Sequence, residues 1–315
     1  MEDFVEYMQS IGRAETTIYQ YTSDLKIFIV WNLQNNNNKE FTKITKREFA
    51  RFQNYCLNTW GWSPKRVRRV KAVISSLSNY IENILDEEPE YEGYRAIIRK
   101  IESPADDTVR EKTVFSIEEL QGLLDYLVDH EEYEKACMLS LAMNSGRRKA
   151  ELPRFKVNYF TDDNVRFGSL YKTPEKVRTK GRGSGKYIEL YVLKNEFDPY
   201  LKLWLEERNR KGIESEWLFP SRSDQNAPIS TDVLDYWAKN FTNIIGKDFY
   251  WHSLRHLFTS ECLRKNLPSS VVQEIVGWES ADMVNLYDDR DADETLSMYF
   301  DENGIKNIKP GSLTG

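Results

Sequence analysis

The stretch Trp251-His252-Ser253-Leu254-Arg255-His256, with Gly277-Trp278 and Tyr287 downstream of it, says most about this chain. His252 and Arg255 are three residues apart, so both side chains lie on one side of a helix and can reach one ligand. Tyr287 follows the tryptophan of the Gly-Trp pair by nine residues. An arginine-rich site beside a tyrosine suits the cleavage of a phosphodiester if the tyrosine is the nucleophile.

Two upstream stretches add positive charge to this set. The first is Ser145-Gly146-Arg147-Arg148-Lys149-Ala150-Glu151-Leu152, which holds two adjacent arginines, and the second is Arg178-Thr179-Lys180-Gly181. The planar guanidinium of arginine binds phosphate through two parallel hydrogen bonds. Arg148 and Arg255 are therefore candidate donors to the non-bridging oxygens of a phosphodiester, where negative charge builds up during cleavage.

Six residues, taken in this order, resemble the catalytic set of the tyrosine recombinases, the phage integrase family, and in particular its two-domain Cre and Xer type. They are Arg148, Lys180, His252, Arg255, Trp278 and Tyr287. The resemblance selects Arg148 over Arg147, because the catalytic arginine of the family stands three residues before a Glu-Leu pair. Arg147 then stands where the family usually has an apolar residue.

The resemblance also implies a role for each remaining residue of the set. Tyr287 is the nucleophile and forms a 3′-phosphotyrosine, and His252 assists proton transfer or binds the phosphate. Lys180 is the general acid on a strand hairpin, a place that Lys176 and Lys186 also fit. Most relatives carry a second histidine where this chain has Trp278, and Cre-type relatives carry tryptophan.

The resemblance implies no metal and no nucleotide cofactor. His252 and His256 have the spacing of a zinc pair, i and i+4, but no glutamate follows His252 and no third ligand is visible. The three cysteines, Cys56, Cys137 and Cys262, are far apart and are expected to be reduced and buried. We expect a cytoplasmic protein, because no run of apolar residues is long enough to span a bilayer.

Charge is distributed unevenly along the chain, whose net charge is −6. Residues 41–83 hold nine Lys and Arg against two Asp and Glu, and residues 170–186 hold six against one. Residues 86–107 hold eight acidic side chains against three basic ones. Phosphate contacts come from local clusters of cations, so this asymmetry fits a chain that binds DNA on one side.

The N-terminal region is expected to be helical. Ser63-Pro64 predicts the start of a long helix, in which Val67, Val70 and Ile74 form an apolar stripe. Five cations in its first half are predicted to contact DNA: Lys65, Arg66, Arg68, Arg69 and Lys71. Two further helix starts are predicted from the capping boxes Thr45 with Glu48 and Ser116 with Glu119.

These patterns predict a mainly α protein with a small antiparallel β-sheet, an α+β fold. Residues 1–105 resemble a helical, SAM-like core-binding domain, and residues 106–315 resemble the catalytic domain with a C-terminal tail. The alternating residues 165–168 and 187–193 are predicted strands on either side of a Gly- and Lys-rich hairpin. The polar stretch 102–108 is the predicted linker.

Three functions remain open on the sequence. The first is a site-specific DNA recombinase or integrase, with double-stranded DNA as its partner. It would be a homotetramer in synapsis and a monomer or dimer when free. The second is a DNA-binding repressor, a phage regulator that keeps the recombinase fold but not the reaction, and the third is a type IB topoisomerase. The tail segment 294–300 is expected to form a short helix that docks on a neighbouring subunit, and packing on its own subunit is the alternative.

Overall fold

The computed structural model describes residues 1–105, 114–179, 186–278, 300–301 and 304–305. The chain divides into two compact units, one made of the residues up to Arg110 and one that begins at Glu111. The predicted boundary after residue 105 borders residues outside this range and stays a prediction. Among the described residues, no helix is long and apolar enough to cross a membrane.

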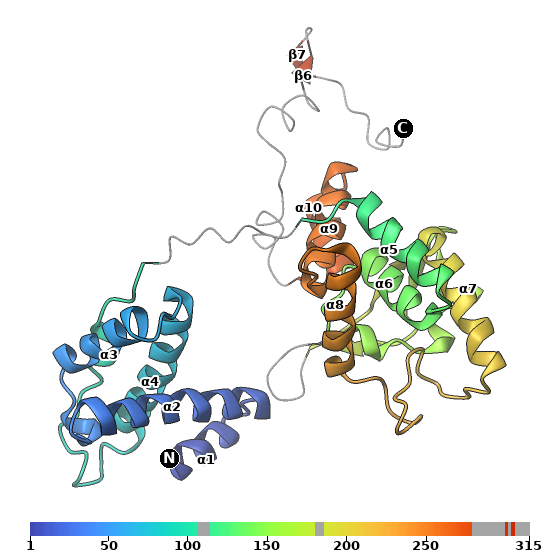
Figure 1. Ribbon diagram of the computed structural model, residues 1–315. Helices are drawn as coiled ribbons and strands as arrows, with labels where there is room; N and C mark the ends of the chain where they lie inside the picture. Colours follow the sequence, from blue (N-terminus) through green and yellow to red (C-terminus); the bar gives the residue numbers. More distant parts are fainter. Residues whose placement is uncertain (106–113, 180–185, 279–299, 302–303, 306–315) are drawn as a thin grey trace. The chain divides into compact units, whose positions relative to one another are not determined.

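The N-terminal unit consists of helices around an aromatic core (Figure 1). Its elements are α1 (Glu2–Ser10), α2 (Glu15–Asn35), η1 (Phe41–Lys43), α3 (Lys46–Asn58), α4 (Pro64–Ile84) and η2 (Ile98–Lys100). Phe28 lies edge-on to Phe52, with their ring centroids 4.9 Å apart, and Trp31 packs beside them. The predicted apolar stripe of α4 closes this core, since Val67, Val70 and Ile74 are buried.

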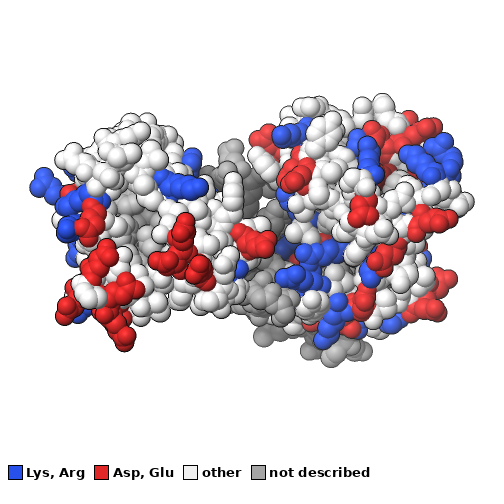
Figure 2. Space-filling model, turned by 90° about the horizontal axis from the view of Figure 1, so that it is seen from below, with Lys and Arg blue, Asp and Glu red and all other residues white. Residues whose placement is uncertain are grey.

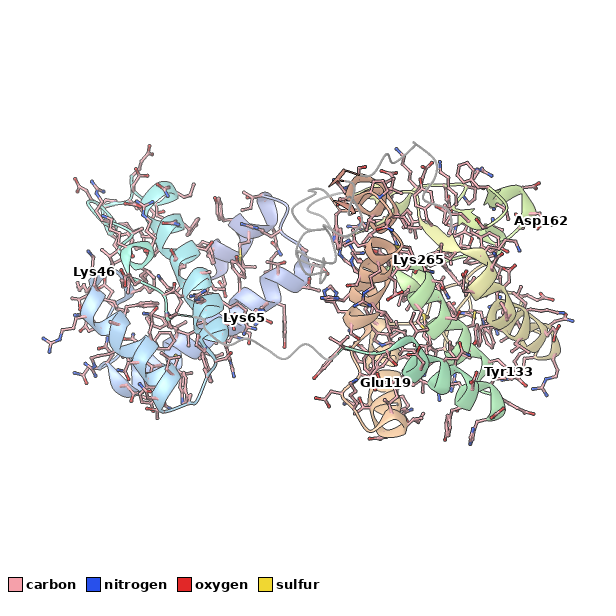
Figure 3. The ribbon with its side chains drawn as sticks, turned by 90° about the horizontal axis from the view of Figure 1, so that it is seen from above. Lys46, Lys65, Glu119, Tyr133, Asp162 and Lys265 are labelled. Atoms are coloured by element: carbon pink, nitrogen blue, oxygen red, sulfur yellow. The ribbon has the colours of Figure 1, made fainter. Side chains whose placement is uncertain are left out.

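The C-terminal unit is built around one helix. In chain order its helices are α5 (Ile117–Asp129), α6 (Tyr133–Ser145), η3 (Leu152–Arg154), η4 (Val157–Tyr159), η5 (Asp162–Asn164), α7 (Lys194–Arg210), α8 (Thr231–Ile245), α9 (Trp251–Arg264) and α10 (Ser269–Val276). Residues 136–142 of α6 are all buried, and α6 contacts α5, α7 and α9. Figure 3 labels Tyr133 at the start of α6 and Lys265 just after the end of α9. Because α6 is held on several sides by other helices, the position of its C-terminal end at Ser145 is fixed.

The strands of the C-terminal unit are short. They are β1 (Val165–Arg166), β2 (Leu170–Lys172), β3 (Val177–Arg178), β4 (Tyr187–Ile188) and β5 (Tyr191–Leu193). β1, β2 and β5 form one antiparallel sheet, in which Tyr171 pairs with Val192, and β3 pairs with β4 as a hairpin. Beyond them, β6 (Phe300–Asp301) pairs with β7 (Gly304–Ile305).

The predicted fold class, mainly α with small antiparallel sheets, is confirmed. The predicted starts of α3, α4 and α5 are also correct, because Thr45 and Ser116 form complete capping boxes and Ser63 accepts from the Arg66 N–H.

The predicted strands are wrong in two details. The strand expected over 187–193 is interrupted at Glu189 and Leu190, and the Leu190 N–H donates to the Thr173 hydroxyl. The strand expected over 165–168 ends at Arg166, because Phe167 and Gly168 take left-handed conformations and form a turn.

Acidic and basic side chains are interspersed over the C-terminal unit on the face that Figure 2 presents, while acidic side chains gather at one edge of the N-terminal unit. No face in that view carries one sign alone.

Candidate functional site

Arg148 is presented by a tight turn at the end of α6. Gly146 ends the helix in the left-handed conformation, with φ +59°. A Cβ atom on Gly146 would lie 2.5 Å from the Phe258 ring, so only glycine fits this approach of α6 to α9. Arg148 then pairs with the buried Glu151, at 3.1 Å between Nη1 and Oε1, and its side chain is 34% exposed. The arginine is thus held and still open to a ligand.

Arg255 lies on α9 and is 1% exposed. Its Nη1 donates to the Gly146 carbonyl oxygen at 2.8 Å, across 109 residues of sequence. This contact joins the middle of α9 to the turn before Arg148, so the two candidate arginines occupy one locality. A buried guanidinium is costly unless its donors are used, which ties Arg255 firmly to that turn.

Trp278 directly follows α10 and is held by the way that helix ends. The N–H of Trp278 donates to the Gln273 carbonyl, and the N–H of Gly277 donates to the Glu274 carbonyl, which is the Schellman arrangement. Trp278 is buried in an apolar cluster that Val272 of α10 and Phe258 of α9 share. The guanidinium carbon of Arg255 lies 4.9 Å from the centre of the Trp278 ring.

His252 lies on α9, one turn before Arg255, and its side chain is exposed. Desolvation lowers the pKa of His252, and the positive charges of Arg255, His256 and Arg148 lower it further. His252 and Arg255 are three residues apart on α9, so their side chains lie on the same side of the helix. At neutral pH its unprotonated form is favoured, and this form can accept a proton.

Arg147, the residue that departs from the family pattern, does not point to solvent. It is 1% exposed, and its guanidinium donates to the Ile275 carbonyl oxygen near the end of α10 and, through Nε at 3.1 Å, to the Ser145 carbonyl oxygen. The two adjacent arginines therefore have different surroundings: Arg148 is partly open, and Arg147 is buried between two helix ends.

The structure brings together four of the six predicted catalytic residues, namely Arg148, His252, Arg255 and Trp278. Lys180 and Tyr287 lie outside the described residues, as do 294–299 of the predicted tail helix. Phe300, the last residue of that predicted helix, is in β6 instead, paired with Ile305. Thr179, next to Lys180 in the chain, ends the described hairpin with a 2.6 Å bond from its N–H to the Lys186 carbonyl.

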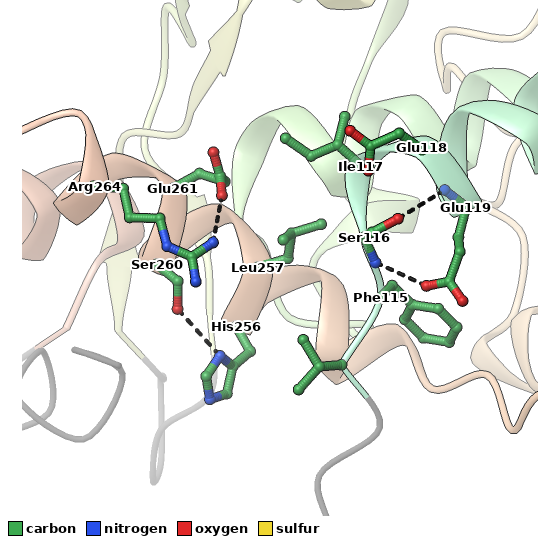
Figure 4. Close-up of a pocket in the computed structure, with 11 residues that line it drawn as sticks. Phe115, Ser116, Ile117, Glu118, Glu119, His256, Leu257, Ser260, Glu261 and Arg264 are labelled. Atoms are coloured by element: carbon green, nitrogen blue, oxygen red, sulfur yellow. Dashed lines mark hydrogen bonds and ion pairs between the residues drawn. The ribbon is translucent and has the colours of Figure 1, made fainter. Parts of the chain in front are cut away.

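His256 lines an open pocket of about 680 Å³ beside α9, together with residues at the start of α5 (Figure 4). Its Nδ1 is 3.4 Å from the Ser260 hydroxyl, and Arg264 on the same helix pairs with Glu261. Among the residues that the structure describes, no three His, Cys, Asp or Glu side chains lie close enough together to hold a metal ion.

The five predicted DNA contacts on α4 differ in how far they are available. Lys65, labelled in Figure 3, is exposed near the N-terminal end of the helix. Arg66 is also exposed, and its guanidinium stacks on Trp62 with 3.8 Å between the guanidinium carbon and the ring centre. Arg68 is exposed and donates from Nε to the Pro104 carbonyl oxygen.

The other two cations of that set have structural partners. Arg69 is half exposed but binds the buried Asp24 of α2 through two hydrogen bonds, of 3.0 and 3.1 Å. Lys71 is 8% exposed and donates to the Ile101 carbonyl and the Ser103 hydroxyl. Burial therefore removes Lys71 from the expected contacts to DNA, and this is a correction to the sequence prediction.

Sequence reasoning missed two members of this arrangement. Glu151 holds Arg148, and its position three residues further along the chain could have indicated the pair. The contact of Arg147 with Ile275 spans 128 residues, and no local sequence pattern predicts it.

Two family models match the chain. The model of the phage integrase family matches residues 113–294, and the model of the phage integrase N-terminal SAM-like domain matches residues 1–89. The chain is 30% identical over 304 residues to the SPbeta prophage-derived recombinase-like protein YomM of Bacillus subtilis (strain 168), which covers 94% of this chain and 89% of that protein.

More distant relatives agree with this result. The tyrosine recombinase XerA of Pyrococcus furiosus is 22% identical over 289 residues, which cover 91% of this chain and 88% of that protein. The solved structure of the XerH site-specific recombinase bound to palindromic difH substrate has a TM-score of 0.66 at 20% identity, over 90% of this chain and 79% of that chain. Likeness at this level of identity shows a shared fold.

Proposed function

The chain belongs to the phage integrase family of tyrosine recombinases, and from this premise we propose that it cuts and rejoins double-stranded DNA at specific sites through a 3′-phosphotyrosine. One observation carries the proposal. Arg148 and Arg255 are 107 residues apart (255 − 148) but are linked through the Gly146 turn at the end of α6, and His252 lies three residues before Arg255 on α9. Trp278 covers Arg255 in the same place. Such a cluster of donors has the chemistry of a binding site for the scissile phosphate.

The proposed reaction begins with an attack of the Tyr287 oxygen on the phosphorus of the scissile phosphate. The bond from phosphorus to the tyrosine oxygen forms, the bond to the 5′-oxygen breaks, and Lys180 gives a proton to the leaving 5′-oxygen. The charge on the non-bridging oxygens is stabilised by Arg148 and Arg255. The same steps in reverse, with the 5′-hydroxyl of another strand, rejoin the DNA.

His252 takes part in proton transfer or binds the phosphate. Its lowered pKa favours the neutral imidazole, which can accept a proton from the phenol or orient it. The indole N–H of Trp278 is a proposed donor to a phosphate oxygen, and its ring is a proposed support for the nucleophile. The proposal needs no metal ion and no nucleotide cofactor.

The proposed partners are double-stranded DNA at specific sites and further copies of the chain. We propose a monomer or dimer in free solution, a homotetramer in synapsis, and action in the cytoplasm. Lys65, Arg66 and Arg68, with the half-exposed Arg69, are the proposed phosphate contacts of the N-terminal unit.

A suicide-substrate assay tests the proposal. Duplexes that the protein binds are first selected from random-sequence DNA, and nicked versions are then incubated with wild type, Tyr287→Phe and, as a matched control, Tyr299→Phe. We expect wild type and Tyr299→Phe to form an adduct that survives denaturation, and Tyr287→Phe to bind the DNA without forming one. An adduct that persists in Tyr287→Phe contradicts the assignment of the nucleophile.

Other outcomes separate the alternatives. Sequence-specific binding with no adduct in any variant supports the silent repressor and overturns the proposed reaction. An adduct without exchange of strands between two sites supports a type IB topoisomerase.

A further inference from the structure

We propose that Arg147 is a positioning residue, which holds the end of α10, and with it Trp278, against the turn that carries Arg148. The inference concerns the arrangement of the site. Its consequence for catalysis rests on the proposed function.

The contacts of Arg147 complete the end of α10. The last carbonyls of a helix have no partner within it, and those of Gln273 and Glu274 accept from the N–H groups of Gly277 and Trp278. The Ile275 carbonyl, next in line, accepts from Arg147. A cation at a helix C-terminus also has a favourable interaction with the helix dipole. Two of the last carbonyls of α10 thus have partners close by in sequence, and the Ile275 carbonyl has a distant one, Arg147.

The burial of a charged side chain at Arg147 indicates that it does more than fill space in the core. Burial lowers the pKa of Arg147 to about 10, so the guanidinium is still charged at neutral pH. A buried charge costs several kcal/mol unless its interactions offset that cost, whereas an apolar side chain would fill the space without it. The atom Nη1 has no hydrogen-bond partner within the described part of the chain, so the hydrogen bonds come from Nε and Nη2. The negative charge of Glu151 also favours the charged guanidinium.

Arg147 closes a ring of contacts around the site. Arg255 donates to Gly146, the residue next to Arg147, and the Trp278 ring covers Arg255. Trp278 follows α10, whose Ile275 carbonyl binds Arg147. If Arg147 were lost, the ring would open between α6 and α10, and the end of α10 would lose its hydrogen bond to the turn before Arg148. We therefore expect the loss of Arg147 to change the positions of Trp278 and of Arg255, which lies against its ring.

The closing experiment compares Arg147→Met, Arg147→Lys and a control, Arg208→Met. Arg208 of α7 is likewise buried, at 4% exposure, and donates to backbone carbonyls, but these belong to Ser215, Trp217 and Leu218, outside the site. Each variant is studied at a temperature where circular dichroism shows it folded. The readouts are hydrogen exchange of peptides covering residues 269–278 without DNA, the dissociation constant for the selected duplex, and the single-turnover rate of adduct formation.

We expect Arg147→Met to exchange hydrogens at residues 269–278 at least about tenfold faster than wild type and to cleave about a hundredfold more slowly, the cost of a misplacement of about 1 Å. Affinity for DNA should change less than about twofold. Arg147→Lys should recover part of both losses, because its ammonium can still donate to Ile275. Arg208→Met should lower stability and leave the exchange of this segment as in wild type.

Equal exchange in Arg147→Met and Arg208→Met overturns the inference, whatever the rates. If the wild type forms no adduct, the proposed function fails, and the exchange measurement still decides the role of Arg147. If Arg147→Met does not fold, the exchange and the rate of Arg147→Lys decide it, and wild-type values for both contradict the inference.

Discussion

The guanidinium of Arg255 lies under the ring of Trp278, with 4.9 Å between the guanidinium carbon and the ring centre. A cation over an indole face is attracted to it by about 0.5–2 kcal/mol, depending on solvent exposure. Arg255 also donates to the Gly146 carbonyl, so its plane is fixed on two sides. An arginine fixed in this way does not have to reorganise when charge develops on a bound phosphate, and this is the main source of electrostatic catalysis.

The two arginines are expected to act on the rate more than on binding. Arg148→Ala and Arg255→Ala should each slow adduct formation about a hundredfold, equivalent to about 3 kcal/mol. Arg255→Ala should also lower the free energy of unfolding by about 1–3 kcal/mol, because the buried Gly146 carbonyl loses its donor. Single-turnover cleavage and equilibrium binding measure the two effects. Losses of affinity as large as the losses of rate would make the arginines ordinary phosphate contacts.

Gly277 and Gly246 form a matched pair, because both end a helix with φ +73°. A Cβ on Gly246 meets nothing within 4 Å, whereas a Cβ on Gly277 would lie 2.4 Å from Ile188 Cδ1. Gly246→Ala should therefore lower the free energy of unfolding by about 1 kcal/mol, the cost of the left-handed conformation. Gly277→Ala should cost roughly 0.5–1.5 kcal/mol more, because the Ile188 Cδ1 methyl at the end of a flexible side chain must leave its preferred rotamer. Urea denaturation measures both, and equal losses contradict the packing described for Gly277.

His252 is expected to make stability depend on pH. Its pKa in the folded protein lies below the ordinary value of 6.5, so the unfolded chain binds the proton more readily. The free energy of unfolding therefore falls as the pH falls through 6.5, and this loss of stability is complete once the pH is below the pKa of His252 in the folded protein. Between about pH 7.5 and 5.5, the free energy of unfolding should fall more steeply for wild type than for His252→Gln. Urea denaturation across this range tests the sign, and parallel curves would refute it.

Removal of exposed and of buried cations of α4 should have different effects on the salt dependence of the affinity for DNA. Removal of two charges in Lys65→Gln with Arg68→Gln should reduce the slope of log affinity against log salt by about two, or roughly one per lost phosphate contact. Lys71→Met is the control, because its ammonium is buried against Ile101 and Ser103. This control should lower stability and leave the slope unchanged. A slope that is the same in the double variant identifies the exposed face as merely solvated.

The C-terminal tail is expected to act in assembly. A chain ending after Asp293 should bind a single site as wild type does and lose the higher-order complex on paired sites, because it lacks Leu296, Met298 and Phe300, apolar residues that need a partner surface. A chain ending after Lys309, which keeps these residues, is the control. Native gel shifts with one-site and two-site DNA distinguish the complexes, and normal synapsis by the shorter chain would mean that the tail packs on its own subunit or has no role.

Most of the architecture could be predicted because its signals are local. The capping boxes at Thr45 and Ser116 and the Ser63-Pro64 start depend on residues within one helical turn, and all three begin helices as expected. Lys71 shows how such a signal can be overlooked. It follows Val67 by four residues and precedes Ile74 by three, so it lies on the apolar stripe, and its burial was readable from that spacing.

The remaining features depend on contacts that no local pattern encodes. The interruption of the strand at Leu190 arises because the Thr173 hydroxyl takes its N–H, seventeen residues away in sequence. The doublet of Arg147 and Arg148 gave two equal candidates on residue type alone, and they are distinguished by burial against α10. The sequence thus named four residues that the structure brings together, and their roles stay predictions, but it did not indicate the contacts of Arg147 with Ser145 and Ile275.

The hydrogen bond between Arg147 and Ile275 cannot form until late in the synthesis of the chain. A ribosome makes Arg147 128 residues before the carbonyl that it binds, and α10 is the last helix of the C-terminal unit to emerge among those described. A nascent chain, or one cut between α9 and α10, has both arginine side chains of the ring but neither Ile275 nor Trp278. The cluster of Arg148, His252, Arg255 and Trp278 is therefore incomplete until α10 and Trp278 have been made, so on the proposed function a partial product would lack an assembled site.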